Sequence, residues 1–495
     1  MRETPPLDVV VVGGGPVGVT LSNLLAQHGL RVTALERETD VYHMPRARHV
    51  DWEGMRIFQT FGAADRLEQD MLATRGLRVL DASGELLLEY TAPPLHPAGW
   101  ADYQMSQPNL EETLRGALAS TATGELRTAH EVTALEDRSD HVVVHVRDLV
   151  RGTTAALRTR FVVGCDGANS MVRDHIGSRY QPLGPDHPFL VVDAAGGNGQ
   201  LPDRPTIVCD PTRPHYVSPG GRFPSRFEFM VMPDDDPDEL TSTESVIGLL
   251  RDVIPTGQFE IVRAALYRFH SLAVDRWRSG RVMIAGDAAH VQPPFMGQGL
   301  MSGLRDAANL AWKLALVCQG ESDESLLDTY EAERKAHARA WIEEANRIGG
   351  IVMTTDADEA RARDLRLAEN SAELRPIEPQ LGPGLHSDDP PPAGTLAPQP
   401  RLADGRRMDD VVGPRFLLAA RASLLRAATT DLPGSEHIVV LDDDDPGIGQ
   451  LLDGLRASAV IIRPDRYVLG LAHSPEGLSR LVDRVPVRTP GRRCA

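Results

Sequence analysis

The chain has 495 residues, of which 41% are hydrophobic and 25% are charged, and its formal net charge at pH 7 is -18. This length and composition predict two or three globular domains with sizeable apolar cores. The excess of acidic residues argues against nucleic acids and anionic membrane surfaces as partners, because both would repel it, and no stretch approaches the roughly 18 apolar residues of a membrane span.

The N-terminal segment is predicted to form a β-α-β unit that binds a dinucleotide. Its strand, GxGxxG turn, helix and second strand are, in order, Leu7–Val12, Gly13–Gly18, Val19–Gly29 and Arg31–Leu35. Gly13 permits the tight turn, Gly15 lets a pyrophosphate approach the backbone, and Gly18 allows the helix to pack closely on the strand. Glu36 ends the second strand, where an acid accepts hydrogen bonds from a ribose. An ordinary glycine-rich turn would not need all these parts, so FAD or NAD is expected rather than a 2′-phosphorylated nucleotide.

The next stretch, to residue 177, places polar residues between predicted helices and strands. The elements expected are a helix at Trp52–Phe58, a hairpin at Leu77–Tyr90, a helix introduced by Met105–Glu111 and continuing through Leu114 and Leu118, and strands at Val142–Val146 and Phe161–Gly164. Arg46 and Arg48 would neutralise phosphates, steer an anionic nicotinamide cofactor or, as ordinary surface arginines, pair with nearby acids. Asp166 follows the last strand, where it forms a turn or brings a carboxylate to a bound cofactor.

Residues 178–274 are predicted to form a largely β domain that supplies one wall of a pocket. Glycine, proline and aromatic residues are frequent here, and Arg226–Met232 alternates as a strand with one apolar face. We expect only a minority of the aromatic side chains to line a site, because such stripes more often form core. Arg213, Arg222 and Arg226 would either pair with a substrate carboxylate or be solvated.

A second strand–loop–helix stretch is predicted at residues 281–316. The apolar run Arg281–Ala285 leads into a Gly- and Pro-rich loop, Gly286–Gly299, and helical spacing begins at Ser302. Unpaired N–H groups at such a helix start attract phosphate or another electron-rich group. Asp287, within the loop, can accept hydrogen bonds from hydroxyls.

The C-terminal part is predicted to contain a charged helix, a Pro-rich connector and a small α/β unit. The helix covers Leu326–Ile351 and the connector residues 376–400. In the tail, strands His437–Leu441 and Ala459–Arg463 flank a helix near Ile448–Leu455.

The cysteines and the N-terminus bear on the compartment. Cys165, Cys209, Cys318 and Cys494 show neither CxxC nor metal-ligand spacing, so we expect no metal site and no dithiol chemistry. Met1–Pro6 carries an acid and two prolines, unlike a signal peptide. A reduced, cytoplasmic location is therefore expected.

Three motifs together resemble a known family. Gly13–Gly18, Cys165–Gly167 and Gly286–Asp287 match, in this order, the FAD-dependent aromatic hydroxylases of the p-hydroxybenzoate hydroxylase fold over roughly residues 1–350. The tail, with Ile461–Val468, resembles the thioredoxin-like C-terminal domain of the phenol hydroxylase and 3-(3-hydroxyphenyl)propionate hydroxylase branch.

The resemblance implies an α/β (α+β overall) fold with a Rossmann-like FAD-binding domain, an inserted β-rich substrate domain and a thioredoxin-like tail that lacks CxxC. The expected division is 1–177 (FAD-binding, with the 77–90 hairpin on the substrate side), 178–274 (substrate), 275–375 (FAD-binding and long helices), 376–400 (linker) and 401–495 (tail).

The resemblance also implies roles for individual residues. The cofactor-binding set is Gly13, Gly15, Gly18, Glu36, Arg37, Arg46, Gln107, Asp166, Asp287, Pro294, Gly297, Gly299, Leu300 and Met301. Met301 stands where relatives often carry Asn, so no amide hydrogen bond to the flavin is expected from it. The substrate pocket is expected from Phe223, Arg226, Phe227, Phe229, Pro293 and Phe295. Candidate catalytic residues are His215, Tyr216 and His290 as bases, and Pro294 against the flavin ring.

The implied reaction is hydroxylation of a phenolic or related (hetero)aromatic substrate by an FAD-dependent monooxygenase, which consumes NADH or NADPH and O₂ and acts through a flavin C4a-hydroperoxide. The alternatives are Baeyer–Villiger or epoxidising oxygenation of a natural-product intermediate, and a non-catalytic flavin- or ligand-binding protein. A halogenase is disfavoured because no WxWxIP-like segment is present. The expected partner is a small aromatic molecule, and homodimer formation is left open.

Overall fold

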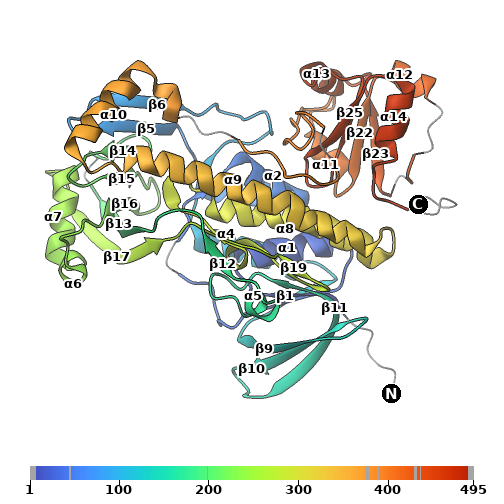
Figure 1. Ribbon diagram of the computed structural model, residues 1–495, viewed down its shortest axis with the longest axis horizontal. Coiled ribbons are helices and arrows are strands. Elements are labelled where there is room, and N and C mark those ends of the chain that lie inside the picture. The colour runs from blue at the N-terminus through green and yellow to red at the C-terminus, as the bar shows by residue number, and fades with distance from the viewer. Residues whose placement is uncertain are drawn as a thin grey trace.

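The computed structural model describes residues 7–43, 46–197, 199–374, 378–386, 389–428, 432–434 and 436–488. Figure 1 shows three parts: a sheet with its helices at the centre and bottom, a β-rich unit at the left, and a C-terminal unit at the upper right. Within the described ranges, no helix is long and apolar enough to cross a membrane.

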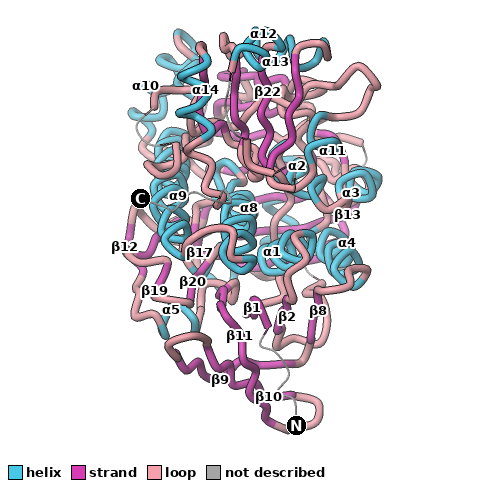
Figure 2. The backbone as a smooth tube through the Cα atoms, turned by 90° about the vertical axis from the view of Figure 1, so that its right-hand side faces the viewer, coloured by secondary structure: helices cyan, strands magenta, loops and turns pink. Residues whose placement is uncertain are grey.

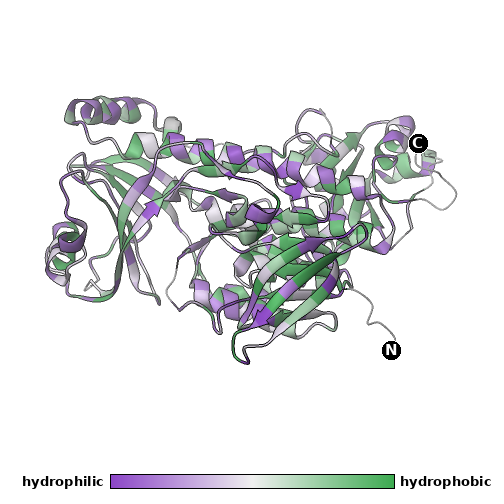
Figure 3. Cartoon of the chain, turned by 60° about the horizontal axis from the view of Figure 1, so that its bottom comes forward, coloured by the Kyte–Doolittle hydropathy of each residue, from purple (hydrophilic) through white to green (hydrophobic). Residues whose placement is uncertain are grey.

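The N-terminal sheet has the strand order β19-β20-β11-β1-β2-β8, and off this path β10 pairs with β11 and β9 pairs with β10. The strands are β1 (Leu7–Val12), β2 (Val32–Leu35), β8 (Gly124–Arg127), β9 (His130–Asp137), β10 (Val142–Asp148), β11 (Thr154–Gly164), β19 (Arg278–Ser279) and β20 (Val282–Ile284). β20, β11, β1, β2 and β8 are parallel to one another, whereas β19 is antiparallel to β20 and β10 is antiparallel to β11. Val9, Val10 and Val11 are fully buried because such a sheet is covered on both faces, and its hydrophobic strands are green in Figure 3.

Helices on and around this sheet connect it to the other parts. They are α1 (Pro16–Gln27), α2 (Trp52–Thr60), α3 (Ala64–Asp70), α4 (Gln107–Ala119), α5 (Met171–His175), α8 (Gln298–Gln319) and α9 (Asp328–Val352). α1 packs against both α4 and α8. Two small sheets join loops: β3 (His49–Val50), β7 (Tyr103–Gln104) and β4 (Leu72–Ala73), and β12 (Tyr180–Pro182), β18 (Leu272–Val274) and β21 (His290–Val291). The 3-10 turns are η1 (Gly286–Ala288), η2 (Pro294–Met296), η3 (Glu324–Leu327) and η4 (Ser371–Leu374).

The β-rich unit is a seven-stranded sheet of order β17-β13-β16-β15-β14-β5-β6. Its strands are β5 (Gly76–Asp81), β6 (Leu86–Thr91), β13 (His187–Gly196), β14 (Thr206–Cys209), β15 (His215–Ser218), β16 (Ser225–Met230) and β17 (Phe259–Phe269). The predicted hairpin near 77–90 thus joins this sheet through the parallel pair β5–β14. Helix α10 (Ala357–Glu369) lies beside β6.

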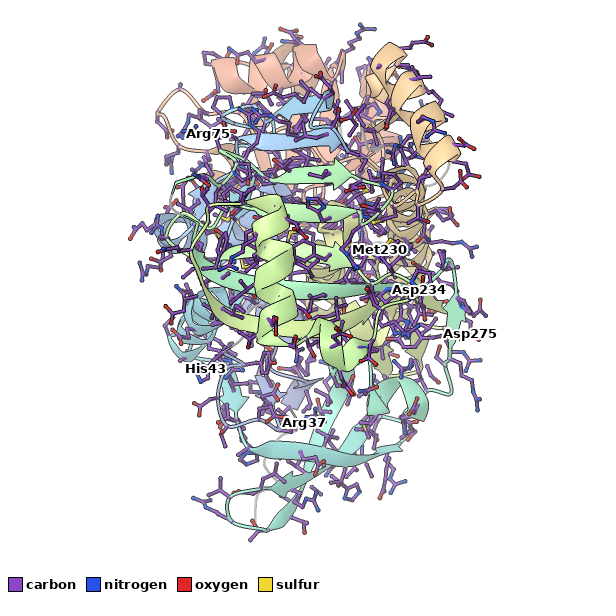
Figure 4. All side chains as sticks on the ribbon, turned by 90° about the vertical axis from the view of Figure 1, so that its left-hand side faces the viewer. Arg37, His43, Arg75, Met230, Asp234 and Asp275 are labelled. Carbon is purple, nitrogen blue, oxygen red and sulfur yellow. The ribbon has the colours of Figure 1, made fainter. Side chains whose placement is uncertain are left out.

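Two helices in this unit were not predicted, because the segment was expected to be largely β. α6 (Pro237–Leu240) and α7 (Thr243–Val253) follow β16, and Figure 4 shows α7 in pale green across one face of the sheet. Val246 and Leu250 of α7 are fully buried in an apolar core with Phe227 and Phe229. Four-residue spacing of these two apolar residues was the sequence signal for the helix.

The C-terminal unit is a four-stranded sheet of order β23-β22-β24-β25 with its own core. Its elements are α11 (Met408–Val412), β22 (Phe416–Ala420), α12 (Ala422–Ala427), β23 (Ile438–Asp442), α13 (Pro446–Gly454), β24 (Ala459–Ile462), β25 (Val468–Ala472) and α14 (Pro475–Val482). β22 and β23 are parallel, whereas β24 is antiparallel to β22 and β25 to β24. The predicted fold class is therefore confirmed, and Figure 2 shows this sheet above the helices of the N-terminal unit.

A buried ionic cluster fastens the C-terminal unit to α9. Arg463 donates two hydrogen bonds to the Glu333 carboxylate, from Nη1 to Oε1 at 2.9 Å and from Nη2 to Oε2 at 2.8 Å. Lys313 Nζ donates to the same carboxylate at 2.7 Å, and Arg463 Nε donates to Asp465 Oδ1 at 2.9 Å. The centre of this cluster is formed by Arg463, Glu333 and Lys313, each of which is 0% exposed. Loss of one partner would leave a buried charge uncompensated.

Arg463→Met is expected to lower the free energy of unfolding by about 3–5 kcal/mol, since it breaks a buried, bidentate pair. Arg339→Met is the matched control on α9, the helix that carries Glu333, because Arg339 pairs with Glu343 at the surface and such pairs contribute about 0.3–0.5 kcal/mol. Chemical denaturation of both variants measures how much unfolding free energy each one loses. Equal losses in the two variants would contradict the view that the buried cluster anchors the C-terminal unit.

Candidate active site

A cavity of about 2040 Å³ lies where the three parts meet. Its walls come from the glycine-rich turn after β1, the loop before α8, one face of the seven-stranded sheet and residues 395–398 before the C-terminal unit. Drug-sized ligands occupy pockets of roughly 300–1,000 Å³. This space therefore suffices for a dinucleotide and a second, smaller molecule.

The glycine-rich turn has the geometry that a phosphate cradle requires. A Cβ atom at Gly13 would lie 2.3 Å from the carbonyl oxygen of Cys165, and one at Gly18 would lie 2.0 Å from the carbonyl oxygen of Gly13. A Cβ at Gly15 would meet no atom within 4 Å, because Gly15 faces open space as the N-cap of α1. Gly13 and Gly18 are thus fixed by packing, whereas Gly15 leaves room for a ligand at a helix N-terminus.

The predicted ribose-binding acid is held in place by the backbone. Glu36 Oε2 accepts from the Gly14 amide at 2.7 Å, and its Oε1 accepts from the Glu38 amide at 2.9 Å. Arg37 lies at the cavity edge, mostly exposed. Arg115, which was not predicted as a site residue, donates from Nη2 to the Gly14 carbonyl at 3.1 Å.

Gln107 positions the loop that carries Arg46. Its Oε1 accepts from the Ala47 amide at 2.8 Å, and its Nε2 donates to Glu111 at 2.9 Å. Gln107, Glu111 and Arg115 lie four residues apart on one face of α4, and this spacing was the signal that could have identified Arg115. Arg46 faces the cavity, with its guanidinium 4.7 Å from the Tyr42 ring centre.

Asp306, fully buried on α8, fixes the Gly286–Asp287 loop. Its Oδ2 accepts from the Gly286 amide at 3.0 Å and lies 2.7 Å from His290 Nε2, and its Oδ1 accepts from Arg334 Nε at 2.9 Å. His290 was predicted as a catalytic base, and this prediction is corrected: the ring is 1% exposed, stacks on Trp277 and does not line the cavity. Its partner Asp306 makes it a structural residue.

Two predicted carboxylates reach the cavity. The Asp287 side chain faces the open cavity. The protein around the cavity nevertheless keeps bulk water away from its carboxyl, and this desolvation raises the pKa of Asp287 although His290 and Arg46 nearby lower it. Asp166 accepts from the Ser170 hydroxyl at 2.5 Å and from the Val172 amide at 3.2 Å. Burial also raises the pKa of Asp166, against these hydrogen bonds.

The loop before α8 lines the cavity through Pro293, Pro294, Phe295, Gly297, Gly299 and Leu300. Gly297, with φ +64°, is the N-cap of this 22-residue helix, so unpaired N–H groups face the space. The Met301 prediction is corrected. Its side chain is buried against α2, where Sδ lies 3.4 Å from the Asp51 amide nitrogen, and it does not line the cavity.

One face of the seven-stranded sheet forms the opposite wall. The residues on this face are Phe189 and Val191 of β13, Tyr216 and Ser218 of β15, Arg226 and Glu228 of β16, and Arg263 and Tyr267 of β17. Arg226 bonds Asp193 in a bidentate manner, at 2.9 and 3.0 Å. Because successive side chains alternate between faces, the neighbours of these residues point to the α7 side.

Several pocket predictions are corrected by this alternation. Phe227 and Phe229 belong to the core beneath α7. His215 bonds the Arg213 carbonyl through Nδ1 at 3.0 Å and lies beside Phe229, so it is absent from the cavity wall and is no candidate base. Phe223 lies behind Arg48, 5.9 Å from its guanidinium, and outside the lining.

The C-terminal unit contributes to the site directly. Tyr467 lines the cavity and donates to Glu53 Oε1 at 2.7 Å. Arg305 pairs with Glu53 and donates from Nη1 to Gln298 Oε1 at 2.7 Å. A continuous chain of buried bonds thus joins the tail to Gln298, the first residue of α8.

Comparisons with known proteins agree with this geometry. Residues 6–345 match the family model described as FAD binding domain. A probable NADH-specific resorcinol 4-hydroxylase of Rhodococcus jostii (strain RHA1) is 35% identical over 98% of this chain and 97% of its own. A 3-(3-hydroxy-phenyl)propionate/3-hydroxycinnamic acid hydroxylase of Burkholderia cenocepacia (strain HI2424) is 34% identical over 93% of each chain.

Solved structures show the same fold. The flavin-dependent monooxygenase PieE, in complex with FAD and substrate, superposes with a TM-score of 0.80 at 23% identity, covering 97% of this chain and 99% of its own. Aklavinone-11 hydroxylase, in a ternary complex with FAD and aklavinone, superposes with a TM-score of 0.77 at 23% identity, covering 98% and 100%.

Gly15→Ala is expected to fold normally and to weaken FAD binding by at least about tenfold, because its methyl group would fill the cradle without touching protein. Gly18→Ala is the matched comparison, since its Cβ would collide with the Gly13 carbonyl and should destabilise the protein itself. Thermal unfolding of the FAD-free chains and FAD titration separate the two effects. A Gly15→Ala protein with unchanged FAD affinity would contradict the role of Gly15.

Asp306→Asn is expected to lower the free energy of unfolding by about 3 kcal/mol at neutral pH, because Arg334 and His290 would lose a buried partner. Burial alone would raise the pKa of Asp306, but His290 and Arg334 outweigh it and hold the pKa below the ordinary 3.8. The stability that this carboxylate adds is therefore present above about pH 4 and lost as the pH falls through the lower folded-state pKa. Denaturant titrations from neutral pH to about pH 3 should show that the difference in unfolding free energy between the variant and wild type becomes smaller as the pH falls. A difference that grows in acid would refute this prediction.

Proposed function

We propose that this chain, which belongs to the FAD-dependent aromatic hydroxylases, oxidises NADH or NADPH and places one oxygen atom of O₂ on a phenolic ring. The observation that carries the proposal is the single cavity that joins a dinucleotide cradle to a chamber walled by the seven-stranded sheet. The relatives named as resorcinol and hydroxyphenylpropionate hydroxylases support a phenolic substrate.

The residues present fit FAD. Gly13, Gly15, Gly18 and Glu36 would hold the ADP half, with the open space at Gly15 receiving the pyrophosphate. On the flavin side, the residues proposed are Arg46, Asp287, Pro294, Gly297, Gly299 and Leu300, all on the cavity wall. FAD, when bound, supplies the redox chemistry by accepting a hydride from the nicotinamide and passing an O₂-derived oxygen to the ring.

The protein's own contribution is to exclude water, orient the substrate and manage its proton. Phe189, Val191, Phe295 and Tyr267 give the chamber an apolar lining, which favours exclusion of water from the reaction. Of the bases predicted from sequence, Tyr216 reaches this chamber. His49, 3.5 Å from Asp102 through Nε2, is a further proton-handling group on the wall.

The purified holoprotein is expected to be yellow and to oxidise NADH faster when a phenol such as resorcinol is added, yielding a product with one added oxygen. NADH is tried first, because the Rhodococcus relative is named as NADH-specific. The measurements are absorbance loss of NADH and product mass. The Gly15→Ala protein is assayed as well, with enough FAD added to reach the same saturation as wild type, so that weaker cofactor binding does not affect the comparison of activities.

Two results would count against the proposal. An ester as product, with oxygen inserted beside a carbonyl, would indicate Baeyer–Villiger oxygenation instead. A yellow protein whose NADH and NADPH oxidation no phenol stimulates would indicate a flavin- or ligand-binding protein without hydroxylase activity.

A further inference from the structure

Glu228 stands out on the cavity face of the sheet. It lies in the middle of β16, opposite Val191 on one side and Tyr216 on the other. It is half-buried and lines the cavity, and no hydrogen bond from another described residue reaches its carboxylate. Carboxylates in such surroundings are normally paired, so this acceptor is available to a ligand.

Arg48 supplies an unused donor on the same wall. It is 9% exposed and lines the cavity. Its Nη1 donates to the Pro224 carbonyl at 2.7 Å and lies 3.7 Å from Asp193. Its Nε and Nη2 are buried without any hydrogen-bond partner among the described residues. A guanidinium left in this state is costly unless a ligand satisfies it.

The two groups act on each other electrostatically but are not hydrogen-bonded. Burial lowers the pKa of Arg48, with Arg226 adding to this and Asp193, Tyr216 and Glu228 opposing it. Burial raises the pKa of Glu228, as Asp193 also does, against Arg226 and Arg48. The neighbouring Asp193 already pairs with Arg226. The Glu228 carboxylate is therefore left as the available acceptor, and the Nε and Nη2 groups of Arg48 as the available donors.

We propose that Glu228 and Arg48 form a subsite for a ring hydroxyl of the substrate, with Glu228 as the base that takes the phenolic proton. The inference rests on the proposed function. The hydroxyl donates to Glu228 and accepts from Arg48, so both unused groups are satisfied at once. A carboxylate on the substrate could only accept hydrogen bonds, and it would place a second negative charge beside Glu228. The subsite therefore selects the hydroxyl of a neutral phenol.

The proton transfer is balanced within this pair. The phenolic O–H bond breaks, its proton moves to a Glu228 oxygen, and its electron pair stays on the phenol oxygen as a phenolate that Arg48 stabilises. The carboxyl formed is neutral and the charge on the ring oxygen faces a cation. The phenolate is the more electron-rich form of the ring, which suits attack on an electrophilic oxygen.

Glu228→Gln tests the subsite in the holoenzyme, with resorcinol and 3-hydroxyanisole (its monomethyl ether) as probes. Wild type is expected to bind resorcinol with the appearance of the phenolate ultraviolet band near neutral pH. Glu228→Gln should bind it about ten- to hundredfold more weakly and without that band. Arg48→Met should likewise weaken binding and suppress the band, whereas Glu228→Asp should restore part of it.

Glu260→Gln on strand β17 of the same sheet is the matched control, because Glu260 is exposed and outside the cavity lining. Its binding and spectra should equal those of wild type. If wild type hydroxylates phenols but Glu228→Gln binds and ionises resorcinol equally well, the subsite is refuted and the proposed function stands. If wild type binds none of the phenols, both fail.

Discussion

Burial of charged side chains along helix α8 is the constraint on which the rest of the structure depends. Arg305 pairs with Asp51 and Glu53, Asp306 holds the Gly286 amide, and Lys313 pairs with Glu333. An unpaired charge in these positions would cost several kcal/mol. Helix α2, the loop after β20 and helix α9 are therefore each fixed to α8. Because α8 begins at the cavity, this helix sets how the walls of the site meet.

Local sterics explain what the sequence could predict. Gly13 and Gly18 are required because a Cβ at either would collide with backbone oxygen, and such collisions depend only on neighbouring chain segments. Val9 to Val11 are buried on both sides of a parallel sheet, and a continuous β-branched run reports this directly. The fold class, the family and the cofactor follow from patterns of this kind.

Long-range packing explains what the sequence could not predict. Alternation in β16 separates Phe227 and Phe229 from Arg226 and Glu228, but it does not say which face meets the cavity. That choice is made by α7, which covers the aromatic face. From its position in a loop, His290 is a reasonable candidate base. Only the folded structure shows that Asp306, on the next helix, lies 2.7 Å from its Nε2 and holds the ring in a structural role. Met301 turns into α2, which no spacing rule indicates.

The site also explains why the C-terminal unit is not merely an appendage. A chamber for oxygen transfer has to exclude water, and here its wall includes Tyr467 and the segment at residues 395–398. Tyr467 reaches Gln298 through Glu53 and Arg305, while Arg463 anchors the same strand–loop–strand region to Glu333. Since these bonds are buried, they form only when the units have docked. Closure of the chamber and assembly of the domains are thus one structural event.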